Sequence, residues 1–202
     1  SVSLPACFLN SKGGVALQIH KILDCLDCNP VIAAVRDDKW DAALQSPAQI
    51  IFYLSANLIT IAEKVSYAHL LGKYVMVHID LAEGIGKDKV GIQFLKQCSV
   101  DGIISTRANL IRLAKEQDMV AIQRFFLLDS KGMESIDEML KTSNPHLMEL
   151  MPGVIDKAIA RFRKGSIPVI AGGLIETKQE VTNALGQGAT AVSTRKNELW
   201  YL

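Results

Sequence analysis

Two short segments near the carboxyl end of the chain contain residues suited to holding an anion. Ala171-Gly172-Gly173 ends an apolar run, and its glycines let the backbone approach a ligand because no Cβ lies in the way. Ser193-Thr194 ends the last apolar run and precedes a short segment with helical potential, whose free N–H groups favour negative charge. Together the two segments predict a phosphate site. The alternative is a pair of tight turns that bind nothing.

A histidine and an aspartate close another apolar run, as His78-Ile79-Asp80. Side chains two residues apart in a strand point to the same side, so both are expected at one face. The pair fits a general base with its orienting carboxylate, part of a metal site, or hydrogen bonds to a polyol. The alternative is a buried histidine satisfied by a nearby carboxylate. Glu83 and Glu149 are available as further metal ligands, but nothing fixes them nearby, so no metal is predicted.

Two arginines are candidates for contact with an anionic ligand, because a guanidinium pairs well with phosphate and carboxylate. They are Arg36 and Arg124. Arg36 has Asp37 and Asp38 as alternative partners. Glu149 could hydrogen-bond the hydroxyl groups of a ligand or only hold Arg124 in place.

A dense basic cluster lies further along the chain, at Lys157, Arg161, Arg163 and Lys164. The ordinary interpretation is a solvated helix face, and the alternative is a modest surface for RNA or another partner. The formal net charge of +1 gives no general support for nucleic-acid binding, but it does not exclude a local basic patch.

Cys25 and Cys28 form a C-x-x-C pair. A zinc site would need two more ligands at close spacing, and a redox pair usually opens a helix after a strand. Here the pair closes an expected helix, so we interpret both residues as reduced thiols. No cofactor is predicted.

From residue 30 onward, β-branched apolar runs alternate with stretches at helical spacing, which is typical of repeated βα units around a parallel sheet. Thr106 is the expected cap of one helix, and Thr177 with Glu180 predicts a capping box for another. The expected strands cover residues 31–35, 50–54, 74–79, 102–105, 120–126, 147–150, 167–171 and 189–193.

Eight such strands predict an α/β fold, a single (β/α)8 TIM barrel, in which ligands bind at the carboxyl ends of the strands. An open doubly wound sheet usually has fewer strands and often a glycine-rich first turn, whereas the first strand here is followed by Arg36. The barrel domain is expected to span residues 30–202. Residues 1–29 would add a flexible arm (1–14) and an extra helix near 19–26 that plugs the amino end of the barrel.

The bulk properties of the chain fit one soluble domain. It has 202 residues, of which 49% are hydrophobic and 21% charged. It contains no apolar run of about 18 residues, and its first residues carry no basic segment typical of a secretory signal. We therefore expect a cytoplasmic protein without a membrane partner.

Seven segments form a distinctive joint pattern, namely PVIAAVRDD (30–38), VHIDLAEG (77–84), DGIISTRANLI (101–111), IQRFFLLDS (122–130), ELMPG (149–153), PVIAGGLI (168–175) and AVSTRKNELW (191–200). Taken together, they resemble the glycerol uptake operon antiterminator regulatory proteins. A-G-G alone is common to many phosphate-binding barrels, but the joint pattern is specific. The resemblance covers about residues 30–202, and residues 1–18 match nothing in that family.

The resemblance implies a bacterial cytoplasmic regulator that senses glycerol 3-phosphate. It also implies action on the leader mRNA of a glycerol operon, where the regulator prevents premature termination of transcription, and it implies no catalysis. Position by position, the implied ligand contacts are His78, Asp80, Arg124, Glu149, Gly153, Gly172, Gly173, Ser193 and Thr194.

A second hypothesis is an enzyme, such as an isomerase, an aldolase or a phosphodiesterase, that acts on a small phosphorylated substrate. His78 would be its acid or base and Asp80 would orient it. The barrel itself does not discriminate, because this fold hosts many functions. The resemblance favours a regulator that is not an enzyme. The sequence leaves open whether the protein is a monomer or a homo-oligomer.

Overall fold

The computed structural model describes residues 14–202, so most of the arm expected before residue 15, including Cys7, lies outside the described residues. The strands are β1 (Val31–Val35), β2 (Ile50–Tyr53), β3 (Tyr74–His78), β4 (Gly102–Ser105), β5 (Val120–Phe126), β6 (Leu147–Met151), β7 (Val169–Gly172) and β8 (Ala191–Thr194). The helices are α1 (Gly14–Cys28), α2 (Trp40–Gln45), α3 (Ile61–Leu70), α4 (Lys89–Gln97), α5 (Ala108–Glu116), α6 (Ser130–Ser143), α7 (Asp156–Phe162) and α8 (Lys178–Gly186). Three short 3-10 helices are η1 (Asp37–Lys39), η2 (Ile79–Leu81) and η3 (Asn197–Tyr201).

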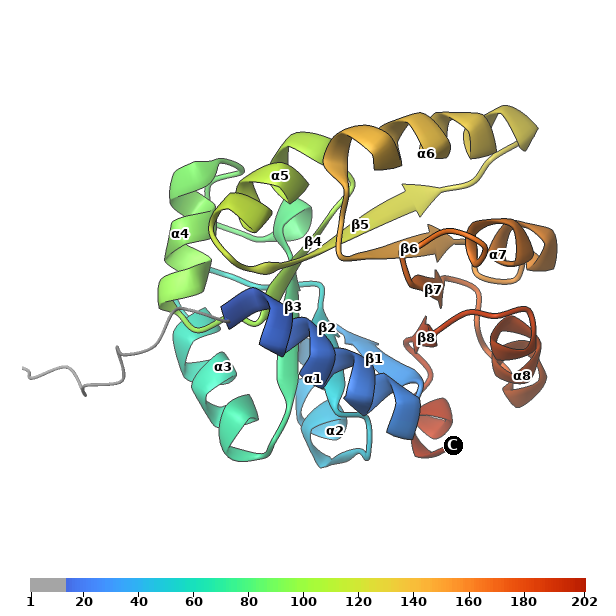
Figure 1. The fold of residues 1–202 in the computed structure, drawn as a ribbon. Coiled ribbons are helices and arrows are strands. Elements are labelled where there is room, and N and C mark those ends of the chain that lie inside the picture. Colours follow the sequence, from blue (N-terminus) through green and yellow to red (C-terminus); the bar gives the residue numbers. More distant parts are fainter. Residues whose placement is uncertain (1–13) are drawn as a thin grey trace, which may run out of the picture.

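The eight strands form a closed barrel in chain order, which confirms the predicted (β/α)8 fold. Every neighbouring pair is parallel, and β1 closes the barrel by pairing with β8. Helices α2 to α8 lie outside the strands (Figure 1). Because all strands run in the same direction, their carboxyl ends and the loops that follow them meet at one end of the barrel.

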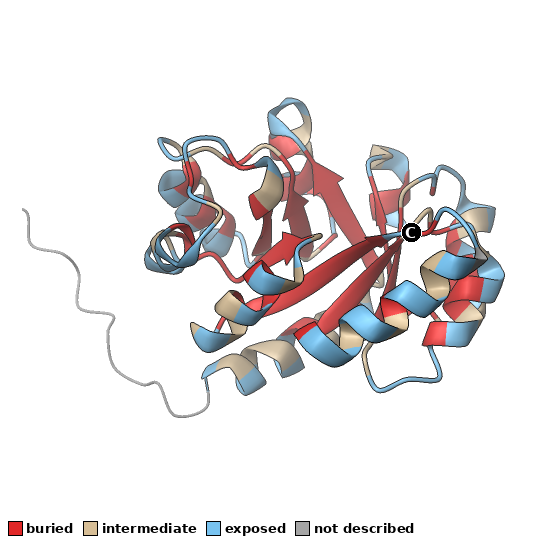
Figure 2. Cartoon of the chain, turned by 90° about the horizontal axis from the view of Figure 1, so that it is seen from above, coloured by how far each residue is buried: buried red, intermediate tan, exposed pale blue. Residues whose placement is uncertain are grey.

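Each strand is buried on both faces, as expected for a parallel sheet covered by helices. Phe52 and Met76 belong to a cluster inside the barrel, whereas their neighbours Ile51 and Val77 pack into a second cluster beneath the helices. Figure 2 shows the buried strands and the exposed outer faces of the helices. This alternation decides which polar side chains near the strand ends point into the barrel.

Helix α1 lies across one end of the barrel (Figure 1). Its Ile22 and Leu26 are only 1% and 2% exposed, and they pack with the interior cluster. That cluster includes Val120 and Leu147, the first residues of β5 and β6, so α1 covers the amino end. The predicted extra helix is therefore present and leaves the carboxyl end open.

Several local predictions are corrected by the structure. The third strand ends at His78 rather than Ile79, because Ile79–Leu81 forms η2. Thr106 does not cap α5, because the amino-terminal cap of that helix is Arg107. The backbone N–H and the hydroxyl of Thr106 donate to Asp80 instead. The capping box of Thr177 and Glu180 on α8 is confirmed.

The last two strands, β7 and β8, each begin two residues later than predicted.

Between residues 14 and 202, none of the helices has both the length and the apolar character needed to cross a bilayer.

Replacing Leu26 with alanine should lower the free energy of unfolding by about 2–5 kcal/mol, because it leaves a cavity at the plugged end of the barrel. Leu17→Ala is the matched control in the same helix, since Leu17 is 57% exposed. The control should change stability by no more than about 0.5 kcal/mol. Urea denaturation followed by circular dichroism measures both, and equal effects would show that α1 is not a plug.

Candidate functional site

A cavity of about 150 Å³ opens at the carboxyl end of the barrel, between the loops that follow β7 and β8. A cavity of similar volume in another protein accepts a molecule of about the size of benzene, so this one suits a small ligand. It is lined by Ala34, Leu54, Arg124, Glu149, Met151, Gly173, Leu174, Ile175, Glu176, Ser193, Thr194, Arg195 and Lys196.

Glu149 organises the wall of this cavity. Arg124 on β5 and Glu149 on β6 are register partners, and Arg124 Nε donates to Glu149 Oε2 at 2.6 Å. The Ser193 hydroxyl on β8 donates to Glu149 Oε1, also at 2.6 Å. The side chains of Arg124 and Glu149 are only 8% and 1% exposed. Glu149 therefore holds Arg124 in place, which was one of the two roles considered from the sequence.

Gly172 makes room for this network. A Cβ at Gly172 would contact Glu149 Oε1 and would lie 2.6 Å from Ser193 Oγ, closer than real side chains approach. The absence of a side chain at this position is thus required by neighbouring protein atoms. Gly173, which follows at a φ of +70°, adopts the left-handed conformation that glycine favours.

Gly153 ties the loop after β6 to the turn after β7. Its backbone N–H donates to the carbonyl oxygens of Gly172 at 2.5 Å and Gly173 at 3.1 Å. A Cβ at Gly153 would lie 2.7 Å from the carbonyl carbon of Ala171. The structure thus shows Gly153 packed behind the cavity wall, where it supports the turn.

Thr194 fixes the two cavity loops relative to one another. Its hydroxyl donates to the Ile175 carbonyl oxygen at 2.6 Å and accepts from the Lys196 backbone N–H at 3.1 Å. Its own carbonyl oxygen accepts from the indole of Trp200, a fully buried residue of η3, at 2.9 Å. The separation of the loops is therefore set by hydrogen bonds within the protein.

His78 is a buried histidine at the carboxyl end of β3, with 4% of its surface exposed. Burial, and then the positive charge of Arg124, lower its pKa to about 4, so the ring is neutral near pH 7. Within the described part of the chain, its Nδ1 has no hydrogen-bond partner. A buried polar atom without a partner is uncommon, and it marks a position that a ligand hydroxyl or water would satisfy.

Asp80 serves the neighbouring loop. It lies in η2 rather than in the strand, so the alternation from which we expected it on the same side as His78 does not apply. Its charge nevertheless acts on the pKa of His78. Its Oδ2 accepts from the Thr106 backbone N–H at 2.7 Å, and the Ser105 hydroxyl donates to Oδ1 at 3.0 Å. Arg107 Nε lies 3.5 Å from Oδ1. Asp80 therefore positions the loop after β4.

The cavity includes five of the nine ligand contacts implied by the resemblance, namely Arg124, Glu149, Gly173, Ser193 and Thr194. The other four, His78, Asp80, Gly153 and Gly172, are not among its lining residues, and Arg36 is exposed directly before η1. Four further lining residues, Leu174, Glu176, Arg195 and Lys196, were not predicted as site residues. Their signal in the sequence is their position directly after the Gly172-Gly173 and Ser193-Thr194 segments, together with the positive charge of Arg195 and Lys196.

The other candidates lie away from this cavity. Cys25 and Cys28 are in the last turn of α1, and burial raises the pKa of Cys25, contrary to what a reactive thiolate requires. The four cations of the basic cluster line the outer surface near α7 and α8. Among residues 14–202, no three His, Cys, Asp or Glu side chains come together as ligands for a metal ion.

Known proteins share both the sequence pattern and the fold. Residues 31–200 match the family model described as glycerol-3-phosphate responsive antiterminator. An uncharacterized Escherichia coli protein, YgcP, is 38% identical over 184 residues, which cover 90% of this chain and 96% of that protein.

Two solved structures are similar to the chain. One is a glycerol uptake operon antiterminator regulatory protein from Listeria monocytogenes, with 36% identity, a TM-score of 0.80, and coverage of 85% of this chain and 95% of that one. The other is a glycerol uptake operon antiterminator-related protein from Thermotoga maritima, with 31% identity and a TM-score of 0.76. The match covers 84% of this chain and 96% of that one.

The lowered pKa of His78 predicts a loss of stability in acid. Its pKa is about 4 in the folded protein and 6.5 in the unfolded chain. Between these values the unfolded chain binds more protons, so the free energy of unfolding falls as the pH drops from 6.5 to 4, by up to about 3 kcal/mol from this residue.

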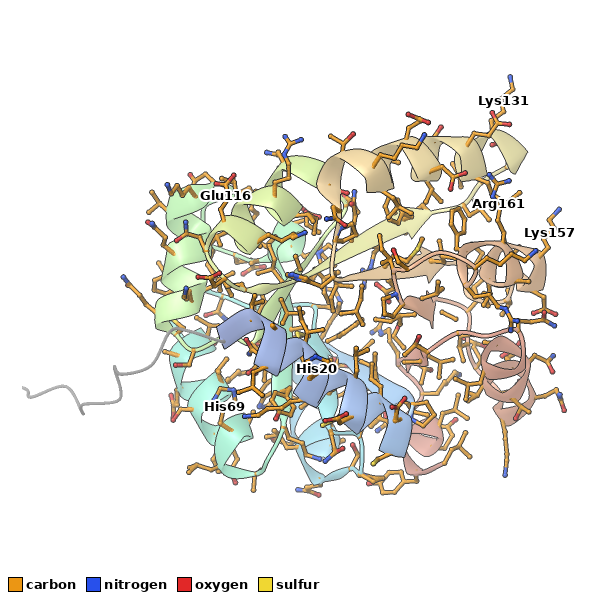
Figure 3. The ribbon with its side chains drawn as sticks, viewed as in Figure 1. His20, His69, Glu116, Lys131, Lys157 and Arg161 are labelled. Carbon is orange, nitrogen blue, oxygen red and sulfur yellow. The ribbon has the colours of Figure 1, made fainter. Side chains whose placement is uncertain are left out.

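His78→Asn should therefore show a smaller fall than the wild type in urea denaturation across this pH range. His146, whose pKa is also lowered to about 4 by burial and by Lys115, adds a similar contribution in both proteins. His20 is exposed on α1 (Figure 3), and His20→Asn is the control that should follow the wild type. A His78→Asn profile parallel to that of the wild type would contradict a buried neutral imidazole.

Proposed function

The chain belongs to the glycerol-3-phosphate responsive antiterminator family, and from this we propose that it binds glycerol 3-phosphate at the carboxyl end of its barrel and prevents premature termination of a glycerol-operon transcript. The observation that carries the proposal is the buried Arg124–Glu149–Ser193 network beside a cavity of about 150 Å³. The network presents fixed polar groups to a small ligand in a site that the protein has already organised.

The phosphate group would lie between the loops after β7 and β8. Barrels of this type frequently hold phosphate there. Gly173 exposes backbone to the cavity, and Arg195 and Lys196 add positive charge at its edge. The hydrogen bonds of Thr194 keep the two loops at a fixed separation, so little ordering is needed when the ligand binds.

The glycerol end would face Arg124, Glu149 and His78. A hydroxyl group both donates and accepts hydrogen bonds, and these three side chains supply donors and acceptors at the inner end of the site. Glu149 occupies Arg124 Nε, which leaves the other guanidinium N–H groups for the ligand. The unpartnered Nδ1 of His78 is a further position for a ligand hydroxyl.

The geometry favours binding over catalysis. General base catalysis by His78 would call for an orienting carboxylate, but both oxygens of Asp80 are engaged by the loop after β4. Within the described residues, the Nδ1 of His78 has no hydrogen bond to Asp80 or Glu149. The regulator would act in the cytoplasm on leader mRNA. The names of two solved relatives describe them as a glycerol uptake operon antiterminator and an antiterminator-related protein.

Isothermal titration with glycerol 3-phosphate tests the proposal, combined with mass spectrometry of the recovered ligand. We expect saturable binding of one molecule per chain, weaker binding of glycerol and of inorganic phosphate, and intact ligand at the end. Conversion of the ligand would favour the enzyme hypothesis. The proposal would be rejected if neither glycerol 3-phosphate nor phosphate bound.

Gly172→Ala should weaken glycerol 3-phosphate binding at least tenfold, a change of about 1.4 kcal/mol, because the added methyl group displaces Glu149 and Ser193. Gly186→Ala at the end of α8 is the matched control, since a Cβ there meets nothing within 4 Å. Its affinity should equal that of the wild type.

Ser193→Ala provides a second test if Gly172→Ala folds poorly. It removes the hydroxyl that donates to Glu149 and should weaken the binding of glycerol 3-phosphate several-fold. Wild-type affinity in both site variants would show that this network does not form the ligand site.

A further inference from the structure

Positive charge is concentrated in the last quarter of the chain. Residues 157–202 contain seven Lys or Arg and three Asp or Glu, a net charge of +4, whereas the whole chain carries +1. Between residues 157 and 175 there are four cations and no acidic residue. The small total therefore conceals a basic stretch that runs along α7 and the segment directly after it.

Four of these cations line one hollow on the outer surface. Lys157, Arg161, Arg163 and Lys164 form one wall of an open hollow of about 530 Å³, and residues 186–187 at the end of α8 contribute to it. We call this hollow the basic groove. Figure 3 shows Lys157 projecting from the end of α7, whereas Arg161 lies between α7 and α6, where its partner Asp137 is located. Lys157 and Arg161 are about one turn apart on α7, or about 6 Å at a rise of 1.5 Å per residue, and Arg163 and Lys164 follow directly after the helix. The four cations can therefore meet more than one phosphate of a nucleic-acid strand.

Most of this charge is not neutralised by neighbouring carboxylates. Over residues 14–202, Arg161 is the member of the groove that forms an ion pair, between its Nη2 and Asp137 Oδ2 at 2.5 Å. That pair is about half exposed, so it costs little to exchange for another anion. The Arg163 side chain lies against Gly188, where a Cβ would collide with it, and Arg163 is exposed. The groove thus presents several cations that an anionic partner can reach.

The form of the groove points to an extended polyanion. A small anion is usually held by converging donors in an enclosed pocket, whereas these cations are spread along an open surface. A protein interface usually has large apolar or aromatic anchors at its centre, but the groove is lined otherwise only by Ala160, Gly186 and Gln187.

We propose that the basic groove is the surface through which this protein binds the phosphate backbone of leader RNA. The inference rests on the proposed function and adds the contact surface. Phosphate contacts position a protein on nucleic acid without reading its sequence, so the groove accounts for affinity.

The groove is also one loop away from the ligand cavity. Helix α7 follows the loop that contains Gly153, and the backbone N–H of Gly153 donates to the Gly172 and Gly173 carbonyl oxygens. A ligand that holds the turn after β7 therefore also acts on the segment leading into α7. We expect the RNA dissociation constant to differ with and without glycerol 3-phosphate.

The test compares two triple variants of the full chain that remove the same charge. Lys157→Gln, Arg163→Gln and Lys164→Gln neutralise the groove and spare the Arg161–Asp137 pair. Lys21→Gln, Lys89→Gln and Arg112→Gln remove two lysines and one arginine from exposed positions on α1, α4 and α5. The probe is a fluorescein-labelled leader RNA with its terminator hairpin, and binding is measured by anisotropy at several salt concentrations with glycerol 3-phosphate present.

We expect the groove variant to bind RNA at least tenfold more weakly. The decrease of log affinity with log salt concentration should become less steep, its slope being smaller in magnitude by about 2. The control variant should retain wild-type affinity and slope. Thermal melting and titration of glycerol 3-phosphate, both expected to be unchanged in the two variants, show that folding and the ligand site are intact. Adding Arg161→Gln should weaken RNA binding further.

Three results would overturn the proposal. Unchanged RNA binding by the groove variant, or an equal loss in the control, would place the RNA elsewhere and leave the ligand-sensing function standing. A wild-type protein that binds glycerol 3-phosphate but no RNA would remove the groove as an RNA surface without affecting the ligand site.

Discussion

The buried carboxylate of Glu149 is the constraint on which the rest of the site depends. A charge at 1% exposure is tolerated only when it is paired and hydrogen-bonded, and Arg124 and Ser193 supply those partners from two other strands. Their approach requires Gly172 to lack a side chain. The site thus depends on three features together. The barrel brings β5, β6 and β8 close to one another, two hydrogen bonds of 2.6 Å join their side chains, and Gly172 leaves room for them.

This arrangement suits the ligand sensing that we propose. The cavity wall is held by contacts within the protein, so a small ligand would meet groups that are already oriented. His78 contributes a neutral ring whose Nδ1 has no partner among the described residues, and Asp80 accepts hydrogen bonds from the loop after β4.

The two ends of the barrel differ in structure, because α1 covers the amino end and the cavity opens at the carboxyl end. Helix α1 fills the amino end with apolar side chains, so ligand access is left to the carboxyl end. The basic groove lies outside the barrel, on the flank formed by α7 and α8. Gly153 joins the two regions through its hydrogen bonds to the turn after β7, so a stiff barrel has a short connection between its cavity and its surface.

The sequence by itself determined the alternation of strands and helices, the capping box of Thr177 and Glu180, and the segments that end the seventh and eighth strands. These features follow from local periodicity and turn chemistry, which neighbouring residues specify. Only the tertiary structure decided that Glu149 joins Arg124 to Ser193, that Asp80 serves the loop after β4, and that Thr194 ties two loops together. These partners are 19 to 44 residues apart in the chain, and their meeting depends on strand register and barrel closure, which no local pattern encodes.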